Sequence, residues 1–365
     1  MASSTLTRKS RAPYIALALI AIAAIVGIVI LRNGSGSTTS APPAQAIASP
    51  APVPTKQTTI TPVHHGAVTT WQVPEALVGL RSIAVGPDGR VWVTEQNRGQ
   101  VDSLEGNQLT RYQIPTLSTD AGAFAFGWGP GGALWFTGYP GGTLGRVFPD
   151  GSVNLFASRG DAATTLGITQ GPDETMWTTD PNLGAVVKVG PDGTITPIEV
   201  SSNGGQTQRP GFIAPGTDGK FMWFTIPDTS QVAKVSTGSD ATITRYEVPG
   251  HVTPRNIVST GDGMFWVSLE DETALAHVDE STGKVSIVPI QGKLPVSGFN
   301  DLALAKDGSL WLTSESNMVL HVSPDGRILG EVHIPGAAYA DGITIAPDGA
   351  IWVAARDDLI TRIQP

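Results

Sequence analysis

The sequence of 365 residues predicts an all-β fold, a seven-bladed β-propeller closed by an N-terminal outer strand and preceded by one transmembrane helix. Gly and Pro, at 43 and 28 residues, indicate many turns, and only 15 % of residues are charged, which argues against a helical bundle. One unit occurs seven times: a short apolar run, a Pro-Asp-Gly type turn, and an apolar-Trp-apolar-Thr strand. Successive tryptophans lie 41 to 46 residues apart, which is the length of a four-stranded blade.

Residues 14–31 form an uncharged, almost wholly apolar segment, near the short end of the roughly 17–25 residues that a spanning helix needs. Three basic residues precede it and only Arg32 follows closely, so residues 1–13 are expected in the cytoplasm. The alternative is a cleaved signal peptide. We expect an uncleaved signal anchor, a single pass through the cell membrane, and an extracellular, or at least extracytoplasmic, domain.

Residues 32–66 are rich in Pro, Ser, Thr and Ala and have few apolar side chains to bury, which predicts a disordered linker. Residues 67–365 then form the propeller as one domain, expected to be monomeric. Because residues 1–66 hold five basic and no acidic residues, the rest has 18 basic against 32 acidic residues, a net charge of −14. Such an acidic domain is a poor partner for nucleic acid.

The strands of the first unit can be assigned from its pattern: Ser82–Val85, Arg90–Glu95, Gln100–Leu104 and Leu109–Ile114. The Val-Trp-Val of the second strand is apolar on both faces, so each repeated tryptophan is expected between neighbouring blades. The seventh unit ends before its outer strand. Val68–Pro74 resembles the outer strands of other units, so we expect it to pair with the C-terminal tail and close the ring.

The innermost strand of each blade begins on the face where the second strand ends, and its first residues surround the central channel. The corresponding positions are Arg81, Phe124, Leu166, Pro210, Arg255, Asn300 and Asp341. Polar groups gather on blades 5 to 7 and 1, and apolar groups on blades 2 and 4, which is typical of a small-molecule site. Wet propeller channels also tolerate polar residues. We assign ligand binding to these residues at the channel mouth: Arg81, Glu95, Glu315 and Arg356.

The segments GPDGRVWVTE, GGALWFT and RYQIP resemble the streptogramin B lyase (virginiamycin B lyase) family across residues 67–365. The resemblance implies a seven-bladed propeller that cleaves the ester of a cyclic depsipeptide by elimination, a carbon–oxygen lyase using Mg²⁺. The family's histidine base begins the innermost strand; Arg255 and Asp341 occupy the matching positions here, and Glu270 has a family counterpart. The resemblance and the placement of His251 in a nearby loop give three candidate catalytic residues: Glu270, His251 and Arg255.

A second segment pair is similar to the calcium-dependent gluconolactonase propellers. Asn300-Asp301-Leu302-Ala303 and Asp341-Gly342-Ile343 match the family's metal-binding strand starts, and their oxygen atoms suit Ca²⁺ or Mg²⁺. This resemblance gives Asn300 and Asp341 as candidate metal ligands. No organic cofactor is expected.

Three functions remain open on these grounds. The first is a membrane-tethered propeller that binds a small molecule or peptide at the channel mouth, since the histidine positions hold other residues. The second is an active lyase or metal-dependent lactonase that opens a cyclic ester. The third is a protein-interaction platform, because propellers host many functions.

Overall fold

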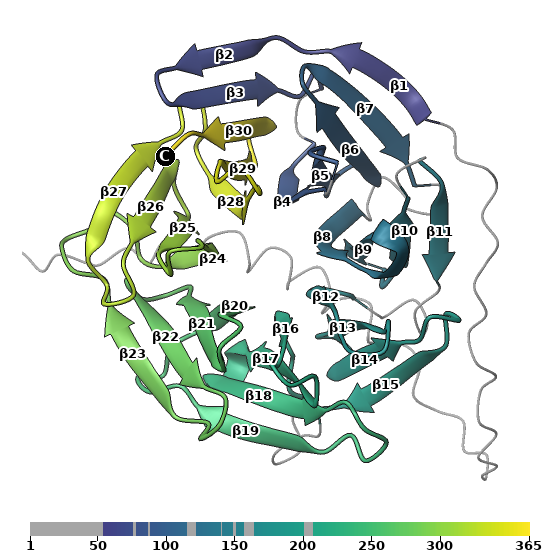
Figure 1. Ribbon diagram of the computed structural model, residues 1–365, viewed down its shortest axis with the longest axis vertical. Coiled ribbons are helices and arrows are strands. Elements are labelled where there is room, and N and C mark those ends of the chain that lie inside the picture. The colour runs from purple at the N-terminus through teal and green to yellow at the C-terminus, as the bar shows by residue number, and fades with distance from the viewer. Residues whose placement is uncertain are drawn as a thin grey trace, which may run out of the picture. The chain divides into compact units, whose positions relative to one another are not determined.

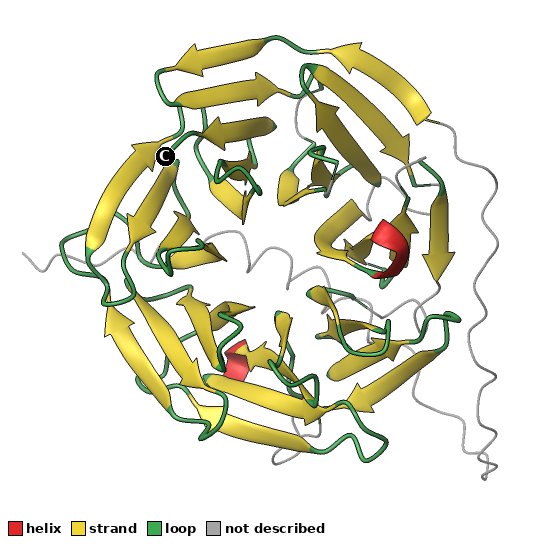
Figure 2. Ribbon diagram, in the orientation of Figure 1, coloured by secondary structure: helices red, strands yellow, loops and turns green. Residues whose placement is uncertain are grey.

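A computed structural model describes residues 54–75, 78–86, 88–114, 122–139, 141–148, 151–156, 164–200 and 207–365. All of them belong to one compact unit, Pro43–Pro365. Seven antiparallel sheets stand around a central axis in this unit (Figure 1), and two short 3₁₀ turns are its helical elements among the described residues (Figure 2). The prediction of a seven-bladed all-β propeller is confirmed.

Each blade is an antiparallel meander whose first repeat strand is innermost. Blade 1 contains β1 (Pro54–Thr59), β4 (Leu80–Val85), β5 (Val91–Glu95), β6 (Gln100–Glu105) and β7 (Gln108–Gln113). Blade 2 contains β8 (Gly122–Trp128), η1 (Pro130–Gly132), β9 (Leu134–Tyr139), β10 (Leu144–Val147) and β11 (Val153–Phe156). Blade 3 contains β12 (Ile168–Gln170), β13 (Met176–Asp180), β14 (Ala185–Val189) and β15 (Ile195–Glu199).

The remaining blades follow the same plan. Blade 4 contains β16 (Ile213–Pro215), β17 (Phe221–Ile226), η2 (Pro227–Thr229), β18 (Gln231–Ser236) and β19 (Ile243–Glu247). Blade 5 contains β20 (Pro254–Ser259), β21 (Met264–Leu269), β22 (Ala274–Asp279) and β23 (Val285–Pro289). Blade 6 contains β24 (Phe299–Leu304), β25 (Leu310–Ser314), β26 (Met318–Val322) and β27 (Ile328–His333). Blade 7 contains β2 (Pro62–His65), β3 (Val68–Gln72), β28 (Ala340–Ile345), β29 (Ile351–Ala355) and β30 (Leu359–Ile363).

The repeated tryptophans pack where the sequence predicted. Six of the seven are at most 5 % exposed, and Trp352 is half-buried. Each belongs to the hydrophobic cluster of the following blade; Trp92 of blade 1, for example, packs with Leu134 and Phe136 of blade 2. His277 and His321 stack on Trp266 and Trp311, with ring centroids 4.3 Å apart in both pairs. These two histidines therefore contribute to packing against the repeated tryptophans.

The predicted closure of the ring is also confirmed. β3 pairs with the C-terminal strand β30 from Val68 opposite Ile363 to Gln72 opposite Leu359. Trp71 of β3 stacks on Trp352 of the same blade, with ring centroids 5.4 Å apart. The N- and C-terminal ends of the domain thus complete one sheet.

The prediction of a disordered linker up to residue 66 is wrong in its last part. β1 pairs with β7 of blade 1, and β2 pairs with β3 of blade 7, so both blades have a fifth, outermost strand (Figure 1). Ile60, between the two strands, is only 5 % exposed and packs in the cluster between these blades. Outer strands can pair through backbone hydrogen bonds alone, so prolines and polar side chains at an edge do not prevent it.

The predicted membrane anchor, residues 14–31, lies outside the described residues. The part of the chain that the structure describes holds no helix with the length and hydrophobicity that a bilayer crossing requires.

A ring of buried hydroxyls joins neighbouring blades. The residue two places after six of the seven repeated tryptophans donates a hydrogen bond to a backbone carbonyl at the start of the next blade's innermost strand. These staple hydroxyls, as we call them, are Thr94, Thr137, Thr179, Thr225, Ser268 and Thr313. Five of them also accept from a backbone N–H of their own blade, so that each links two blades. The repeated threonine of the sequence is therefore a joint between blades.

The junction between blade 7 and blade 1, here the closing junction, lacks this joint. Its equivalent residue is Ala354, which is fully buried and has no hydroxyl. Other groups cross the closing junction instead: Trp71 Nε1 donates to Asn107 Oδ1 at 3.0 Å, and the Gly79 N–H donates to Asp358 Oδ1 at 3.0 Å. The ring is thus closed by different chemistry from that of its other six junctions.

Candidate functional site

Backbone irregularities direct the site residues toward the channel. In five blades the pairing between the innermost and second strands shifts register just after the innermost strand begins, for example between Leu80 and Ile83 and between Ala340 and Ile343. A bulge at this point re-aims the residues within it. Arg81, Arg255 and Asp341 each lie in such a bulge, which explains why the predicted positions face the centre of the ring.

A small pocket, partly open to solvent, lies among these bulges. Its lining residues come from blades 1, 2, 4, 5, 6 and 7: Arg81, Ser82, Phe124, Ala125, Phe212, Arg255, Asn300, Asp301, Asp341 and Gly342. One wall is apolar and aromatic and the other carries guanidinium, carboxyl and amide groups. This is the division that the sequence predicted, and the wall from blades 2 and 4 is the apolar one.

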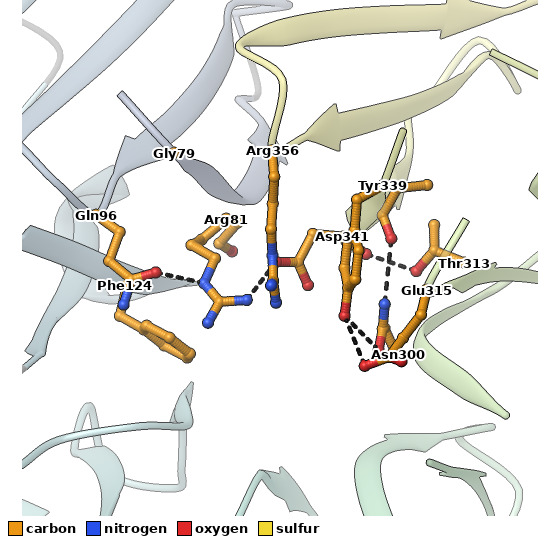
Figure 3. A network of polar contacts seen from close by, with 12 residues as sticks. Gly79, Arg81, Gln96, Phe124, Asn300, Thr313, Glu315, Tyr339, Asp341 and Arg356 are labelled. Carbon is orange, nitrogen blue, oxygen red and sulfur yellow. Dashed lines mark hydrogen bonds and ion pairs between the residues drawn. The ribbon is translucent and has the colours of Figure 1, made fainter. Parts of the chain in front are cut away.

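Asp341 is the centre of a charged network that crosses the closing junction (Figure 3). Its Oδ2 lies 2.5 Å from Arg81 Nη1 and 2.8 Å from Arg356 Nε. Burial raises the pKa of Asp341, and the charges of Arg81 and Arg255 oppose that rise. Arg81 also donates from Nε to Gln96 Oε1 at 2.6 Å, and its guanidinium lies 4.8 Å from the Phe124 ring centre.

Tyr339 links this network to blade 6. The Arg356 guanidinium stacks 3.9 Å above the Tyr339 ring. The Tyr339 hydroxyl lies 3.3 Å from Asn300 Oδ1 and 3.2 Å from Glu315 Oε1, and its single proton is shared between these two acceptors (Figure 3). Burial raises the pKa of Tyr339, so the phenol stays protonated and can donate. Glu315 is exposed and Arg356 half-buried, and neither of these predicted ligand-binding residues is among the residues that line the pocket.

Arg255 forms the other side of the pocket. Its Nη1 lies 3.0 Å from Glu270 Oε1. Burial alone would lower the pKa of Arg255, but the carboxylates of Glu270 and Asp341 outweigh burial and raise it. The guanidinium therefore stays charged, and it holds Glu270 beside the pocket.

Asp301 is a carboxyl group that joins three blades. It accepts hydrogen bonds from the Asn256 side chain of blade 5, from its neighbour Leu302 N at 2.8 Å and from Ile343 N of blade 7 at 3.1 Å. Burial raises its pKa to about 6, although these hydrogen bonds oppose the rise. Its oxygens are occupied by donors of the protein, which suits a positioning role.

Glu95 and His251 are two further predicted site residues outside the pocket lining. Glu95 does not line the pocket; it is fully buried and its Oε1 lies 2.9 Å from Arg111 Nη2, beside Asp102. Burial, with the nearby charge of Asp102, raises the pKa of Glu95 to about 9. His251 is exposed in the loop before β20, with a positive φ of 56°, and is not among the lining residues.

The candidate metal ligands do not form a cation site. Asn300 uses its Nδ2 to donate to Ala340 O at 3.3 Å and its Oδ1 to accept from Tyr339, while Asp341 is engaged by two guanidinium groups. The described residues contain no group of three His, Cys, Asp or Glu side chains that could hold a metal ion. A divalent cation would have to displace positively charged arginines, so these residues do not fit Ca²⁺ or Mg²⁺.

The sequence missed Phe212 and Tyr339. Phe212 stands two residues after the position assigned to blade 4, where the tryptophan spacing is longest, at 46 residues. Tyr339 precedes the bulge position of blade 7 by two residues, so strand alternation would have placed it on the same face.

Comparison with known proteins gives consistent matches. Residues 66–363 match the model of the virginiamycin B lyase family. A virginiamycin B lyase of Nocardia farcinica (strain IFM 10152) is 27 % identical over 212 residues, which cover 58 % of this chain and 70 % of the relative. The chain is similar to the selenomethionine-substituted virginiamycin B lyase of Staphylococcus aureus with a TM-score of 0.73 and 21 % identity, covering 82 % of this chain and 99 % of that one.

Two further solved structures are similar. A catalytically inactive variant of the Staphylococcus aureus enzyme with quinupristin has a TM-score of 0.73 and 21 % identity, over 82 % of this chain and 99 % of that chain. The WD40 propeller domain of Doa1 has a TM-score of 0.65 and 13 % identity, over 80 % of this chain and 95 % of that chain. At these identities the structural likenesses support the fold alone.

Proposed function

Because the chain belongs to the virginiamycin B lyase family, we propose that it keeps the family's scaffold as a membrane-tethered, extracytoplasmic binding protein. In this proposal a small molecule or peptide binds in the central pocket and leaves chemically unchanged. The pocket supports binding because an aromatic wall from Phe124 and Phe212 faces a polar wall from Arg81, Arg255 and Asp341.

The observation that carries the proposal is the absence of a free base in the pocket. Eliminative cleavage needs a group that removes a proton next to the ester. No histidine is among the residues that line the described pocket. The lining carboxyls are engaged: Asp341 by two arginines, and Asp301 by three hydrogen-bond donors. The site therefore favours holding a ligand over removing its proton.

One observation favours an active lyase as the second candidate. Glu270 Oε1 is paired with Arg255, and its second oxygen has no hydrogen-bond partner among the described residues. A carboxylate beside the pocket with one free oxygen could act as a base. Glu270 thus remains the residue on which catalysis would depend.

The test uses the full-length chain in detergent with quinupristin, the ligand of one solved relative, with and without Mg²⁺. We expect saturable binding by equilibrium dialysis and a single unchanged peak by liquid chromatography and mass spectrometry. Elimination would give a new peak of equal mass, and hydrolysis would add the mass of one water. A new peak of equal mass that Glu270→Gln abolishes would overturn the binding proposal in favour of a lyase; a peak heavier by one water would indicate a lactonase.

The proposed tether has its own test. A variant that lacks residues 1–31 is compared with the full-length chain after cell fractionation. We expect the full-length chain in the membrane fraction and the shortened chain in the soluble fraction. Release of a form that begins near residue 47 from the full-length chain would show a cleaved signal peptide instead.

A further inference from the structure

We propose that the ligand of the central pocket carries a carboxylate joined to an aromatic or similarly apolar group, and that Arg81 and Arg255 bind the carboxylate. This inference depends on the proposed binding function and narrows it to a class of ligand: acids of the acyl-amino-acid type, free or at the end of a peptide.

Both arginines line the pocket and keep hydrogen-bond donors unused. Arg81 donates from Nε to Gln96 and from Nη1 to Asp341, which leaves Nη2 without a partner among the described residues. Arg255 donates from Nη1 to Glu270, which leaves Nε and Nη2. Guanidinium groups bind carboxylates through paired, charge-assisted hydrogen bonds, which are about twice as strong as neutral ones.

The protein's own acids near these arginines are already neutralised. Asp341 is shared by Arg81 and Arg356, and Glu270 is held by Arg255, so three guanidinium charges face two carboxylates that are ion-paired with them. Asp301, which is also in the pocket, is surrounded by three donors of the protein. The arginine donors that remain are therefore available to an anion from outside.

The apolar wall lies directly beside the donors. The Arg81 guanidinium carbon lies over the Phe124 ring, 4.8 Å from the ring centre. This contact uses the face of the guanidinium and leaves its edge for in-plane hydrogen bonds. Ala125 and Phe212 continue the apolar surface around the same pocket. A ligand with a carboxylate next to an aromatic ring would satisfy both walls at once.

The experiment measures binding of N-acetyl-phenylalanine and of its uncharged amide to the full-length protein by isothermal titration at low salt. A tripeptide ending in phenylalanine, with a free or amidated end, is the second ligand pair. We expect each acid to bind at least about tenfold more tightly than its amide. Arg255→Gln should remove this preference, and the control Arg327→Gln, at an exposed ion pair on the outer part of blade 6, should keep it.

A variant with the opposite expected sign protects the test against misfolding. Asp341→Asn removes the charge that competes with the ligand, so the acid should bind more tightly than to the wild type. Equal binding of acid and amide, or weaker binding to Asp341→Asn, would overturn the inference. If quinupristin binds but neither acid does, only this inference fails; if neither quinupristin nor the acids bind, the proposed function fails with it.

Discussion

Neighbouring blades are joined by one kind of contact at six junctions of the propeller and by another kind at the closing junction. At the six, a buried hydroxyl such as Thr225 accepts from Phe212 N at 3.0 Å and donates to Arg255 O at 2.8 Å. At the closing junction Ala354 offers no hydroxyl, and the ion pair of Arg81 with Asp341, the Trp71 contact and buried Ile60 span the gap. The staple hydroxyls are neutral and repeat around the ring, whereas the contacts at the closing junction place charged side chains in the pocket.

The difference suggests why the candidate site lies where it does. A hydroxyl satisfies two backbone groups and leaves nothing for a ligand. The guanidinium of Arg81 joins blades 1 and 7 and still has a free donor. The closing junction is therefore one of two places in the pocket with unused polar groups, and Arg255 of blade 5 is the other.

The largest expected effect comes from the aromatic contact at the closing junction. Trp71→Ala removes a 7 % exposed side chain that stacks on Trp352 and donates to Asn107. We expect the free energy of unfolding in urea to fall by about 3–5 kcal/mol. Val63→Ala, on the neighbouring β2 with 52 % exposure, is the control and should have little effect. A small effect of Trp71→Ala would mean that the closing strands contribute little to stability.

The stapled junctions should respond to loss of a single hydroxyl. Thr225→Val keeps the shape but leaves Phe212 N and Arg255 O without their partner, so stability should fall by about 2–3 kcal/mol. Thr242→Val, at an exposed turn, is the matched control. Equal stability of the two variants in urea titrations would contradict the role of the staple hydroxyls.

The buried carboxyl of Glu95 predicts a pH dependence in blade 1. Its pKa is raised from its ordinary value of about 4.5 to about 9 in the folded protein, so between these pH values the folded state retains a proton that the unfolded state has lost. The associated stability is present below pH 4.5 and is lost as the pH rises toward about 9, by up to about 1.4 kcal/mol per pH unit. Glu95→Gln should flatten this dependence in thermal melts, while Glu105→Gln, at an exposed position, should not. Parallel curves for Glu95→Gln and the wild type would contradict the assignment.

The smallest expected effect comes from adding a staple hydroxyl to the closing junction. Ala354→Ser adds a hydroxyl at the seventh staple position and should raise the free energy of unfolding by about 1 kcal/mol. Ala276→Ser places a hydroxyl in the buried core of blade 5, away from the staple positions, and should lower it. If both serines destabilise the protein equally, position 354 does not behave as a staple position, which would contradict the comparison between the closing junction and the other six.

The sequence predicted the parts of the fold that repeat. Seven tryptophan units gave the blades, and the likeness of Val68–Pro74 to the other outer strands gave the closure, because these features depend on side-chain patterns. β1 and β2 were missed because edge strands pair through backbone groups, and Ile60 is the main buried apolar side chain in that segment.

The site was predicted unevenly for a physical reason. Arg81, Arg255, Asn300 and Asp341 were placed correctly at the pocket because they occupy equivalent bulges. Glu95 was misplaced because its partners, Asp102 and Arg111, come from the third and fourth strands of its blade, and this buried ion pair has no equivalent spacing in the repeat. Contacts across strands decide which way such a polar residue faces, and a linear pattern does not contain them.

The most direct test of the claim that the closing junction is also the binding site is hydrogen–deuterium exchange of the full-length chain with and without quinupristin. We expect that ligand slows exchange in β4 and β28, the two innermost strands that flank the closing junction, and in β20, which carries Arg255, more than in other strands. Protection concentrated in β12 and β16, with none in β4 and β28, would contradict it.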